Sequence, residues 1–234
     1  MRILLFVCAT FIFISSNTIE DKNCAYCEGK NVGSSWEFTF YKDNGKIQII
    51  SRTTLKEISD GDSTTDYHME VETLNEKGKN WMGVKPYPTV MKVLKNEPYY
   101  YTDMSGGADA TGNKYMRMSC DEDALNDEGM PDIRWERTTT EGTGASQKTY
   151  TSYVELIDFT YAPGTETVKI GKGEFECIKM TYTILTGSNG ITLGKLEQYV
   201  TTWTSNEYGT VKIEIKDKKG KMLRYGELTD YNFL

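Results

Sequence analysis

The sequence predicts an all-β protein with little helix, in which a strongly curved antiparallel meander sheet is curled into a half-barrel. Apolar side chains fall on every second residue at 178–184 and again at 211–215, with Lys, Thr and Glu between them. Successive side chains of a strand point to opposite faces, so this alternation indicates a sheet with one buried and one solvated face. No window shows the sustained 3.6-residue apolar repeat of a helix. We expect about ten short strands.

The first 18 residues have the pattern of a cleavable signal peptide. Met1 and Arg2 precede an apolar run over residues 3–14, and small polar residues follow it. A membrane-spanning helix needs about 20 apolar residues, and this run is shorter. The next cysteine, Cys24, follows charged residues, so the pattern for lipid attachment is absent. We therefore predict a secreted or periplasmic protein that is soluble rather than membrane-spanning, with residues 19–32 as a cysteine-containing lead-in.

Residues 33–234 are predicted to form one β domain that opens with hairpins. Apolar residues alternate through 36–40 and 47–49, on either side of a turn at Asp43-Asn44-Gly45-Lys46. Glycine adopts the positive φ that such a turn requires, and Asp and Asn tolerate the positions beside it. The same device recurs at residues 75–79 and 217–221. Three such turns between alternating runs predict a meander of hairpins.

The middle of the chain is predicted to be less regular. Residues 65–74, 89–94 and 99–104 alternate like strands, whereas residues 81–88 hold two prolines and should form a loop or an edge. Residues 105–148 are expected to form a flexible acidic insertion. Strand-like residues return at 149–161, after which Pro163-Gly164 is expected to turn the chain.

One phase change predicts a β-bulge near Cys177. Phe175 and Cys177 occupy odd positions, whereas the apolar residues that follow are even-numbered, beginning at Ile178. A one-residue slip moves every later side chain to the other face, and a bulge provides such a slip while bending the strand. The alternative is that both faces are buried at this point and no bulge is needed.

Several segments together resemble a known family. Gly173-Glu174-Phe175-Glu176-Cys177-Ile178-Lys179 is similar to the G-x-F-x-C-x-K segment of exported bacterial β-proteins in the TapB-like group, which is related to domains of unknown function. Trp203, the run at 208–212 and the turn at 218–221 add to the likeness, as do residues 33–37. The resemblance covers about the first 60 mature residues and the last 70. It implies a curved sheet resembling the lipoprotein-carrier (LolA/LolB-like) half-barrels, and it implies no catalytic residue.

The net charge of the chain argues against some classes of binding partner. The net charge is −7 and no basic stripe is present, so nucleic acid and anionic lipid are poor candidates as partners.

Four cysteines remain after the signal peptide, and an even count in an oxidising compartment favours disulfides, with three pairings open. Free thiols and a redox or metal role are the alternatives. The disulfide candidates are Cys24, Cys27, Cys120 and Cys177.

No metal or cofactor is expected. Asp121, Asp123 and Asp127 form the best calcium candidate, but Leu125 stands where a helix–loop–helix calcium site needs a ligand, so a solvated acidic loop is the better interpretation. The one histidine, His68, lies among carboxylates in a predicted strand, and a solvent-facing charged strip explains it more simply than a metal or acid–base site.

The function predicted from these residues is binding rather than catalysis. No nucleophile elbow or phosphate-binding loop is present, and no carboxylate pair is singled out. Tyr99-Tyr100-Tyr101 places rings on both faces of a strand, and aromatic side chains on a concave sheet can hold an apolar ligand or a sugar. We predict that Tyr99, Tyr101, Tyr182 and Trp203 contact a hydrophobic ligand, although ordinary sheet packing would also account for tyrosines.

Three functional hypotheses therefore stay open. The first is a non-enzymatic β-protein that binds a lipid, another apolar ligand or a cell-envelope protein on its concave face. The second is a structural or interaction protein with a filled core, and the third is a carboxylate-based hydrolase. A cavity of a few hundred cubic ångströms under the sheet would favour the first hypothesis over the second.

Overall fold

The protein is a single curved β-sheet. The computed structural model describes residues 30–95, 97, 99–105, 110–119, 131–141, 147–189 and 196–234. Strands account for most of these residues, and the one helix among them is the short 3₁₀ turn η1, Trp81–Gly83. The all-β prediction is confirmed. The strands are β1 (Ser35–Lys42), β2 (Ile47–Asp60), β3 (Thr64–Leu74), β4 (Tyr87–Leu94), β5 (Tyr99–Asp103), β6 (Thr111–Asn113), β7 (Tyr115–Ser119), β8 (Ile133–Glu141), β9 (Lys148–Ile170), β10 (Gly173–Asn189), β11 (Leu196–Ser205), β12 (Gly209–Asp217) and β13 (Met222–Asn232).

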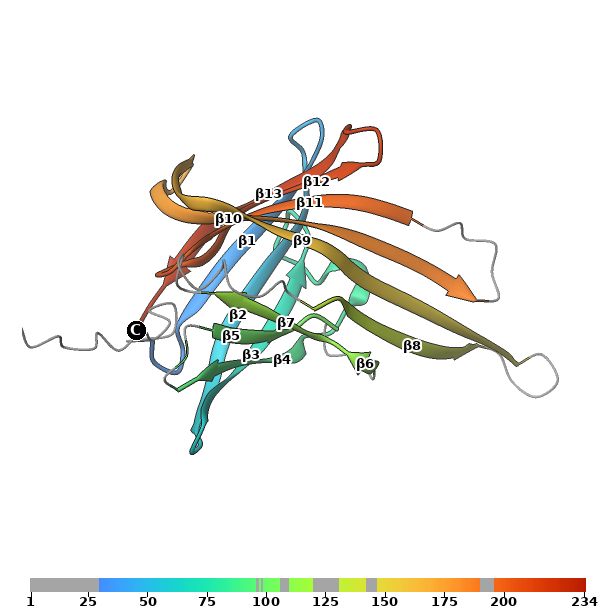
Figure 1. The fold of residues 1–234 in the computed structure, drawn as a ribbon, viewed down its shortest axis with the longest axis horizontal. Helices are drawn as coiled ribbons and strands as arrows, with labels where there is room; N and C mark the ends of the chain where they lie inside the picture. Colours follow the sequence, from blue (N-terminus) through green and yellow to red (C-terminus); the bar gives the residue numbers. More distant parts are fainter. Residues whose placement is uncertain are drawn as a thin grey trace, which may run out of the picture.

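The strands form one antiparallel sheet in the order β6-β8-β9-β10-β11-β12-β13-β1-β2-β3-β4-β5-β7. Strands β1 to β5 and β8 to β13 each pair with their neighbours in sequence, as expected of a meander, and β13 pairs with β1 to join the two ends of the chain. Figure 1 shows the sheet curling round, with β8 and β9 running to the right and β2 to β5 at the lower left. We call the concave inner side of the sheet the hollow.

A single bent segment brings the two edges of the sheet together. The edge strands β6 and β7 are separated only by Lys114, yet β6 pairs with β8 and β7 pairs with β5. An ion pair of 3.0 Å between Lys114 Nζ and Asp103 Oδ2 fixes the bend against β5. The described parts of the predicted insertion at 105–148 therefore form strands of this sheet, and the sheet is more nearly closed than a half-barrel.

The three predicted glycine turns are confirmed. Gly45, Gly78 and Gly220 have φ values of 77°, 70° and 77°. In each turn the glycine N–H donates to the carbonyl oxygen three residues earlier, at 2.9 Å. A side chain with a Cβ would be strained at such a φ, which is the physical reason for glycine at these positions.

The prediction that Pro163-Gly164 turns the chain is wrong, because β9 continues through these residues to Ile170. Thr165 pairs with Ile178 and Tyr161 pairs with Met180, so residues 162–164 of β9 lie opposite the single residue Lys179. A bulge of this kind accommodates a proline, which has no N–H to give to the ladder, and a glycine, whose φ here is 71°.

The phase change at Cys177 does not come from a bulge in β10. Strand β10 pairs without interruption with β11 from Ile178 to Thr186, so the extra residues lie in β9 and not in β10. Cys177 and Ile178 are 0% and 5% exposed. Both faces of β10 are therefore buried here, as the alternative interpretation held, and the bulge lies in the neighbouring strand. The alternation that follows is confirmed as far as Tyr182, since Met180 and Tyr182 are buried and Lys179 is partly exposed, but Thr183 is buried as well.

Two apolar clusters fill different parts of the fold. The first occupies the hollow and includes Leu156, Met180, Val200 and Ile215, together with apolar residues of β2 to β5, β7 and β8. The second joins the tip of the β9–β10 hairpin to β11, β12 and β13. Its buried members are Val168, Ile170, Phe175, Cys177, Trp203, Val211 and Leu228.

Candidate functional site

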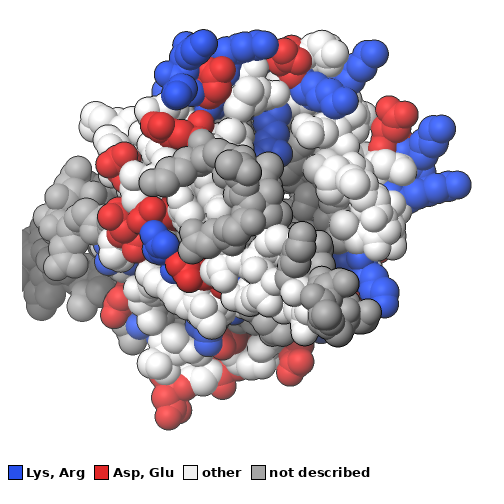
Figure 2. Space-filling model, turned by 90° about the vertical axis from the view of Figure 1, so that its right-hand side faces the viewer, with Lys and Arg blue, Asp and Glu red and all other residues white. Residues whose placement is uncertain are grey.

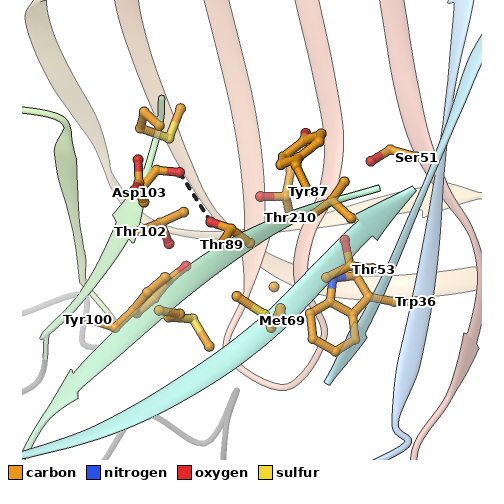
Figure 3. Close-up of a pocket in the computed structure, with 14 residues that line it drawn as sticks. Trp36, Ser51, Thr53, Met69, Tyr87, Thr89, Tyr100, Thr102, Asp103 and Thr210 are labelled. Carbon is orange, nitrogen blue, oxygen red and sulfur yellow. Dashed lines mark hydrogen bonds between the residues drawn. The ribbon is translucent and has the colours of Figure 1, made fainter. Parts of the chain in front are cut away.

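A cavity of about 340 Å³ lies in the hollow of the sheet, on the side formed by β1 to β5. Figure 3 shows Trp36 at one side of the cavity and Tyr100 at the other, with Met69 between them. Most of the lining residues belong to β1 to β5, and the start of β12 supplies two more. The residues that line the cavity are Trp36, Ser51, Thr53, Met69, Val71, Tyr87, Thr89, Met91, Tyr100, Thr102, Asp103, Met104, Gly209 and Thr210.

The strand register explains why these residues share one face. Thr53 pairs with Trp36 on one side and with Val71 on the other, and Val71 pairs in turn with Tyr87. Directly paired residues of neighbouring strands lie side by side on the same face of a sheet. These four paired residues form one row across β1 to β4. Because every second residue of a strand points to the same face, the residues two positions along each strand form a second row on that face.

The cavity wall is about half apolar and half polar, and several of its polar groups are hydroxyls. Trp36, Met69, Met91 and Tyr100 provide thioether and aromatic surface. The hydroxyl groups belong to side chains on four strands, namely Ser51, Thr53, Tyr87, Thr89, Thr102 and Thr210. Burial raises the pKa of the Tyr87 hydroxyl, so this group stays protonated and can donate a hydrogen bond. Small-molecule sites are usually lined mostly by apolar side chains with a few polar groups. This wall is more polar than that, which suits a ligand with both apolar and hydrogen-bonding parts.

Asp103 is a fixed charge at the edge of the cavity. Its Oδ1 accepts hydrogen bonds from the N–H and the hydroxyl of Ser105, at 2.8 and 2.6 Å, and its Oδ2 pairs with Lys114. Burial raises the pKa of this carboxyl, but the hydrogen bonds from Ser105 and the charge of Lys114 outweigh it, and the pKa lies below its usual value. Both oxygens are thus already engaged, and Asp103 is held as an anion.

The four predicted ligand contacts lie in different places. Tyr182 belongs to the first cluster, where it stacks on Phe159 at 5.4 Å, and burial strongly raises its pKa. Trp203 belongs to the second cluster. Its indole N–H donates to Glu166, and the Nζ atoms of Lys179 and Lys212 lie 5.3 and 4.8 Å from its ring.

Tyr99 and Tyr101 flank the tyrosine that lines the cavity. Tyr100 is 5% exposed and faces the hollow, so its two neighbours in β5 point to the opposite face. The guanidinium of Arg117 lies 4.7 Å from the ring of Tyr99. The predicted division of the three rings between both faces is confirmed. Tyr100 and the other lining residues were not predicted, although the alternation of β2 to β5 would have pointed to them.

Cys177 is the one cysteine in the part of the chain that the structure describes. Its thiol is buried and unpaired among those residues, and its pKa is raised to about 12, chiefly by burial and further by Glu176 and Glu166. The other disulfide candidates, Cys24, Cys27 and Cys120, lie outside the described residues. So do the calcium candidates Asp121, Asp123 and Asp127 and the predicted signal peptide at 1–18.

His68 lies in a strip of paired charges on β3. Lys92 binds Asp66 and Lys56 binds Glu70, each at 2.8 Å. Among the described residues, no group of three or more His, Cys, Asp or Glu side chains is placed to hold a metal ion. The same residues include no helix with the length and apolar character needed to cross a bilayer.

Comparison with known proteins identifies the family. The chain belongs to the DUF3108-like family, whose sequence profile matches residues 31–228. The related-domain part of the predicted resemblance is thereby confirmed, and it extends through the middle of the chain. The TapB-like and lipoprotein-carrier likenesses stay predictions. Among curated proteins, none matches the sequence significantly.

Two solved structures share the fold. One is "a putative lipoprotein" from Parabacteroides distasonis, with a TM-score of 0.69 and 17% identity over 87% of this chain and 96% of the other. The other is "a putative exported protein with YmcC-like fold" from Bacteroides fragilis, with a TM-score of 0.68 and 15% identity over 87% of this chain and 97% of the other. At such identities the likeness shows the fold alone.

Proposed function

We propose that this protein is an exported, non-enzymatic β-protein that binds a small amphipathic ligand in the hollow of its sheet. The observation that carries the proposal is the cavity of about 340 Å³, whose wall combines apolar surface with hydroxyl groups in about equal parts. This volume lies within the range of about 300–1,000 Å³ that is usual for small-molecule sites. The ligand it suits has an apolar body and a few groups that can hydrogen-bond to Thr or Tyr hydroxyls.

The distribution of the core supports binding over a filled interior. Side chains such as Leu156, Met180 and Val200 occupy the part of the hollow beneath β9 to β11. The cavity lies where this packing ends, beside β1 to β5. A protein whose sheet served only as a scaffold for surface contacts would gain stability by closing such a space, because voids forfeit dispersion contacts.

The chemistry of the lining also favours binding over hydrolysis. A carboxylate-based hydrolase needs two carboxyl groups placed on either side of the bond that breaks. Among the described residues that line the cavity, Asp103 is the one carboxylate, and Ser105 and Lys114 already engage its oxygens. Its lowered pKa suits a structural anion and not a proton donor near neutral pH.

A matched pair of variants tests the proposal. Thr53→Phe places a ring in the cavity, whereas Thr54→Phe makes the same change one residue along β2, on the opposite face. Binding of 1-N-phenylnaphthylamine, measured by fluorescence, should weaken about tenfold or more in the Thr53 variant because the apolar space is filled. The Thr54 variant should bind like the wild type.

Native mass spectrometry of the protein purified from its own host gives a second measurement. We expect a bound small molecule that is retained by the Thr54 variant and lost from the Thr53 variant, while both variants melt within a few degrees of the wild type. Equal probe binding by the two variants, or a wild type that neither binds the probe saturably nor carries a ligand, would refute the cavity as a binding site.

A further inference from the structure

The fold gathers lysine-bearing turns that are far apart in the sequence. Lys42 pairs with Arg224, and Arg224 pairs with Ile215, so the β1–β2 turn and the β12–β13 turn stand side by side. Figure 1 shows these two turns together at the top of the molecule. The pairing of Leu74 with Ile50 places the third turn, residues 75–79, beside the start of β2.

This turn end carries a concentrated positive charge. Its three turns and the loop that follows β3 hold eight exposed lysines against three carboxylates, Asp43, Glu76 and Asp217, a net charge of +5 on a chain of net charge −7. In Figure 2, blue side chains gather along the upper and right-hand parts of the face in view, whereas red ones predominate at its left and bottom. The lysines are Lys42, Lys46, Lys77, Lys79, Lys85, Lys218, Lys219 and Lys221.

These lysines differ from the basic residues on the strands. Arg52, Lys56 and Lys92 each form an ion pair with an acidic residue of a neighbouring strand. Within the described ranges, no ion pair joins any of the eight turn lysines to a carboxylate. Their charge is therefore available to an external anion and is not neutralised by the protein itself.

An exposed apolar loop lies at the same end. Loop 81–84 follows the third turn directly, and its Met82 side chain is 82% exposed while Val84 is 37% exposed. Met82 has a φ of 49°, a left-handed conformation that is unusual for a residue other than glycine. No side chain of this short 3₁₀ turn is buried, so packing does not explain the strained backbone. Trp81, which is half-buried, stands next to it.

We propose that this turn end docks the protein on the surface of an anionic phospholipid bilayer. The lysines would pair with headgroup phosphates, and Met82, Trp81 and Val84 would enter the interfacial layer. Lysines around a few protruding apolar residues are typical of surfaces that bind anionic membranes. An acidic protein partner would use the lysines but would leave the single protruding Met82 without a role. The lack of a basic stripe in the linear sequence argued against anionic lipid, but the charge is assembled only by the fold.

Vesicle co-sedimentation tests the proposal without reference to the cavity. Wild-type protein should bind vesicles of phosphatidylglycerol and phosphatidylethanolamine, bind pure phosphatidylcholine vesicles weakly or not at all, and dissociate in high salt. Neutralising Lys218 and Lys219 to Gln should weaken binding at least tenfold, since each lysine near an anionic surface contributes about fivefold. Met82→Ser should weaken binding severalfold and reduce the blue shift of Trp fluorescence on vesicle addition.

Matched controls distinguish binding through the turn end from a general effect of the net charge of the protein. Lys169→Gln with Lys172→Gln removes the same charge at the β9–β10 tip, at the opposite end of β13, and Leu196→Ser removes an apolar side chain that is 50% exposed elsewhere. Both controls should bind like the wild type. Equal losses from the turn variant and its control, or equal binding to anionic and neutral vesicles, would overturn the proposal, as would an absence of vesicle binding.

Discussion

Asp103 lines the cavity and also stabilises the bend that brings the two edges of the sheet together. Its carboxylate contacts Ser105, two residues beyond it just after the end of β5, and Lys114 at the bend between β6 and β7. Its side chain is only 10% exposed, so its charge is poorly solvated by water and depends on these partners. The bend that brings together the two edges of the sheet therefore relies on a titratable group beside the cavity.

We predict that Asp103→Asn lowers stability by about 1–3 kcal/mol at pH 7, because the ion pair between Asp103 and Lys114 is lost in a half-buried setting. The pKa of Asp103 is lowered in the folded protein. The stability it provides is therefore present above the unfolded-state pKa of about 3.9 and is lost as the pH falls through the folded-state pKa. Urea denaturation of both proteins from pH 7 to pH 3 should show the difference shrinking below about pH 4. The same change at exposed Asp43 should have little effect, and a difference that stays constant with pH would contradict the assignment.

The tyrosines of β5 show what residue-scale reasoning could and could not predict. Three consecutive tyrosines must divide between the two faces of a strand, and they do. Which face is the hollow depends on the partners of β5, since Tyr100 pairs with Val93 and Met118 to join an apolar row. That choice is made by the pairing of β5 with β4 and β7. We predicted Tyr99 and Tyr101 as ligand contacts, whereas Tyr100 lines the cavity.

At the scale of single elements, β13 owes its position to a residue with no side chain. Gly226 pairs with Ile213 on one side and Phe40 on the other. A Cβ at this position would collide with the ring of Phe38 and lie 3.0 Å from carbons of both Ile213 and Phe40. The aromatic rings of β1 thus pack directly against the backbone of β13.

Gly226→Ala should destabilise the protein by about 1–3 kcal/mol, as overpacking does where rings cannot move aside. The reason is steric, because Gly226 does not have the left-handed φ of the turn glycines. Gly171→Ala is the matched control, since a Cβ there meets nothing within 4 Å and its φ is also ordinary. Thermal unfolding of the two variants should separate them by several degrees. Equal melting temperatures would mean that the rings of β1 adapt freely.

Element-scale prediction succeeded where the determinants are local. The turns at 43–46, 75–79 and 217–221 carry their own glycine and a side-chain acceptor, as when Asp217 Oδ1 binds the N–H groups of Lys219 and Lys221. Pro163-Gly164 has equally strong turn chemistry, but it lies in a β-bulge, because β10 provides a partner strand on both sides of it. Whether a turn signal bends the chain back depends on a strand pairing that the local sequence does not encode.

At the scale of the whole molecule, the fold depends on the pairing of the two chain ends. Strand β1 lies between β2 and β13, and its Thr39 hydroxyl is 2.8 Å from that of Thr229, 190 residues away. The sequence predicted the hairpins but could not supply this closure. Nor could it show that 111–119 bridges the two edges or that the lysine turns converge, since each of these features is a relation between distant segments.

The C-terminal residues should therefore stabilise the entire sheet and not only its last strand. Tyr231 and Phe233 stack at 5.4 Å, Tyr208 lies 4.9 Å from the first ring and 5.8 Å from the second, and Leu234 accepts hydrogen bonds from Asn31. These contacts join the end of β13 to the β11–β12 turn and to the start of the described chain.

Deleting residues 231–234 removes two partly buried aromatic rings and these end-to-end hydrogen bonds. The loss should be about 3 kcal/mol, since full burial of one such ring contributes about 1.5–3 kcal/mol. For a protein of this size that corresponds to a fall of about 10 °C in Tm. Because β13 and β1 lie in the middle of the sheet order, far-UV and near-UV circular dichroism should report one shared transition at the lower temperature. Tyr231→Phe keeps the ring and should melt near the wild type. Two separate transitions in the truncated protein would show that β8 to β11 fold independently of the chain ends, and would contradict a single cooperative sheet.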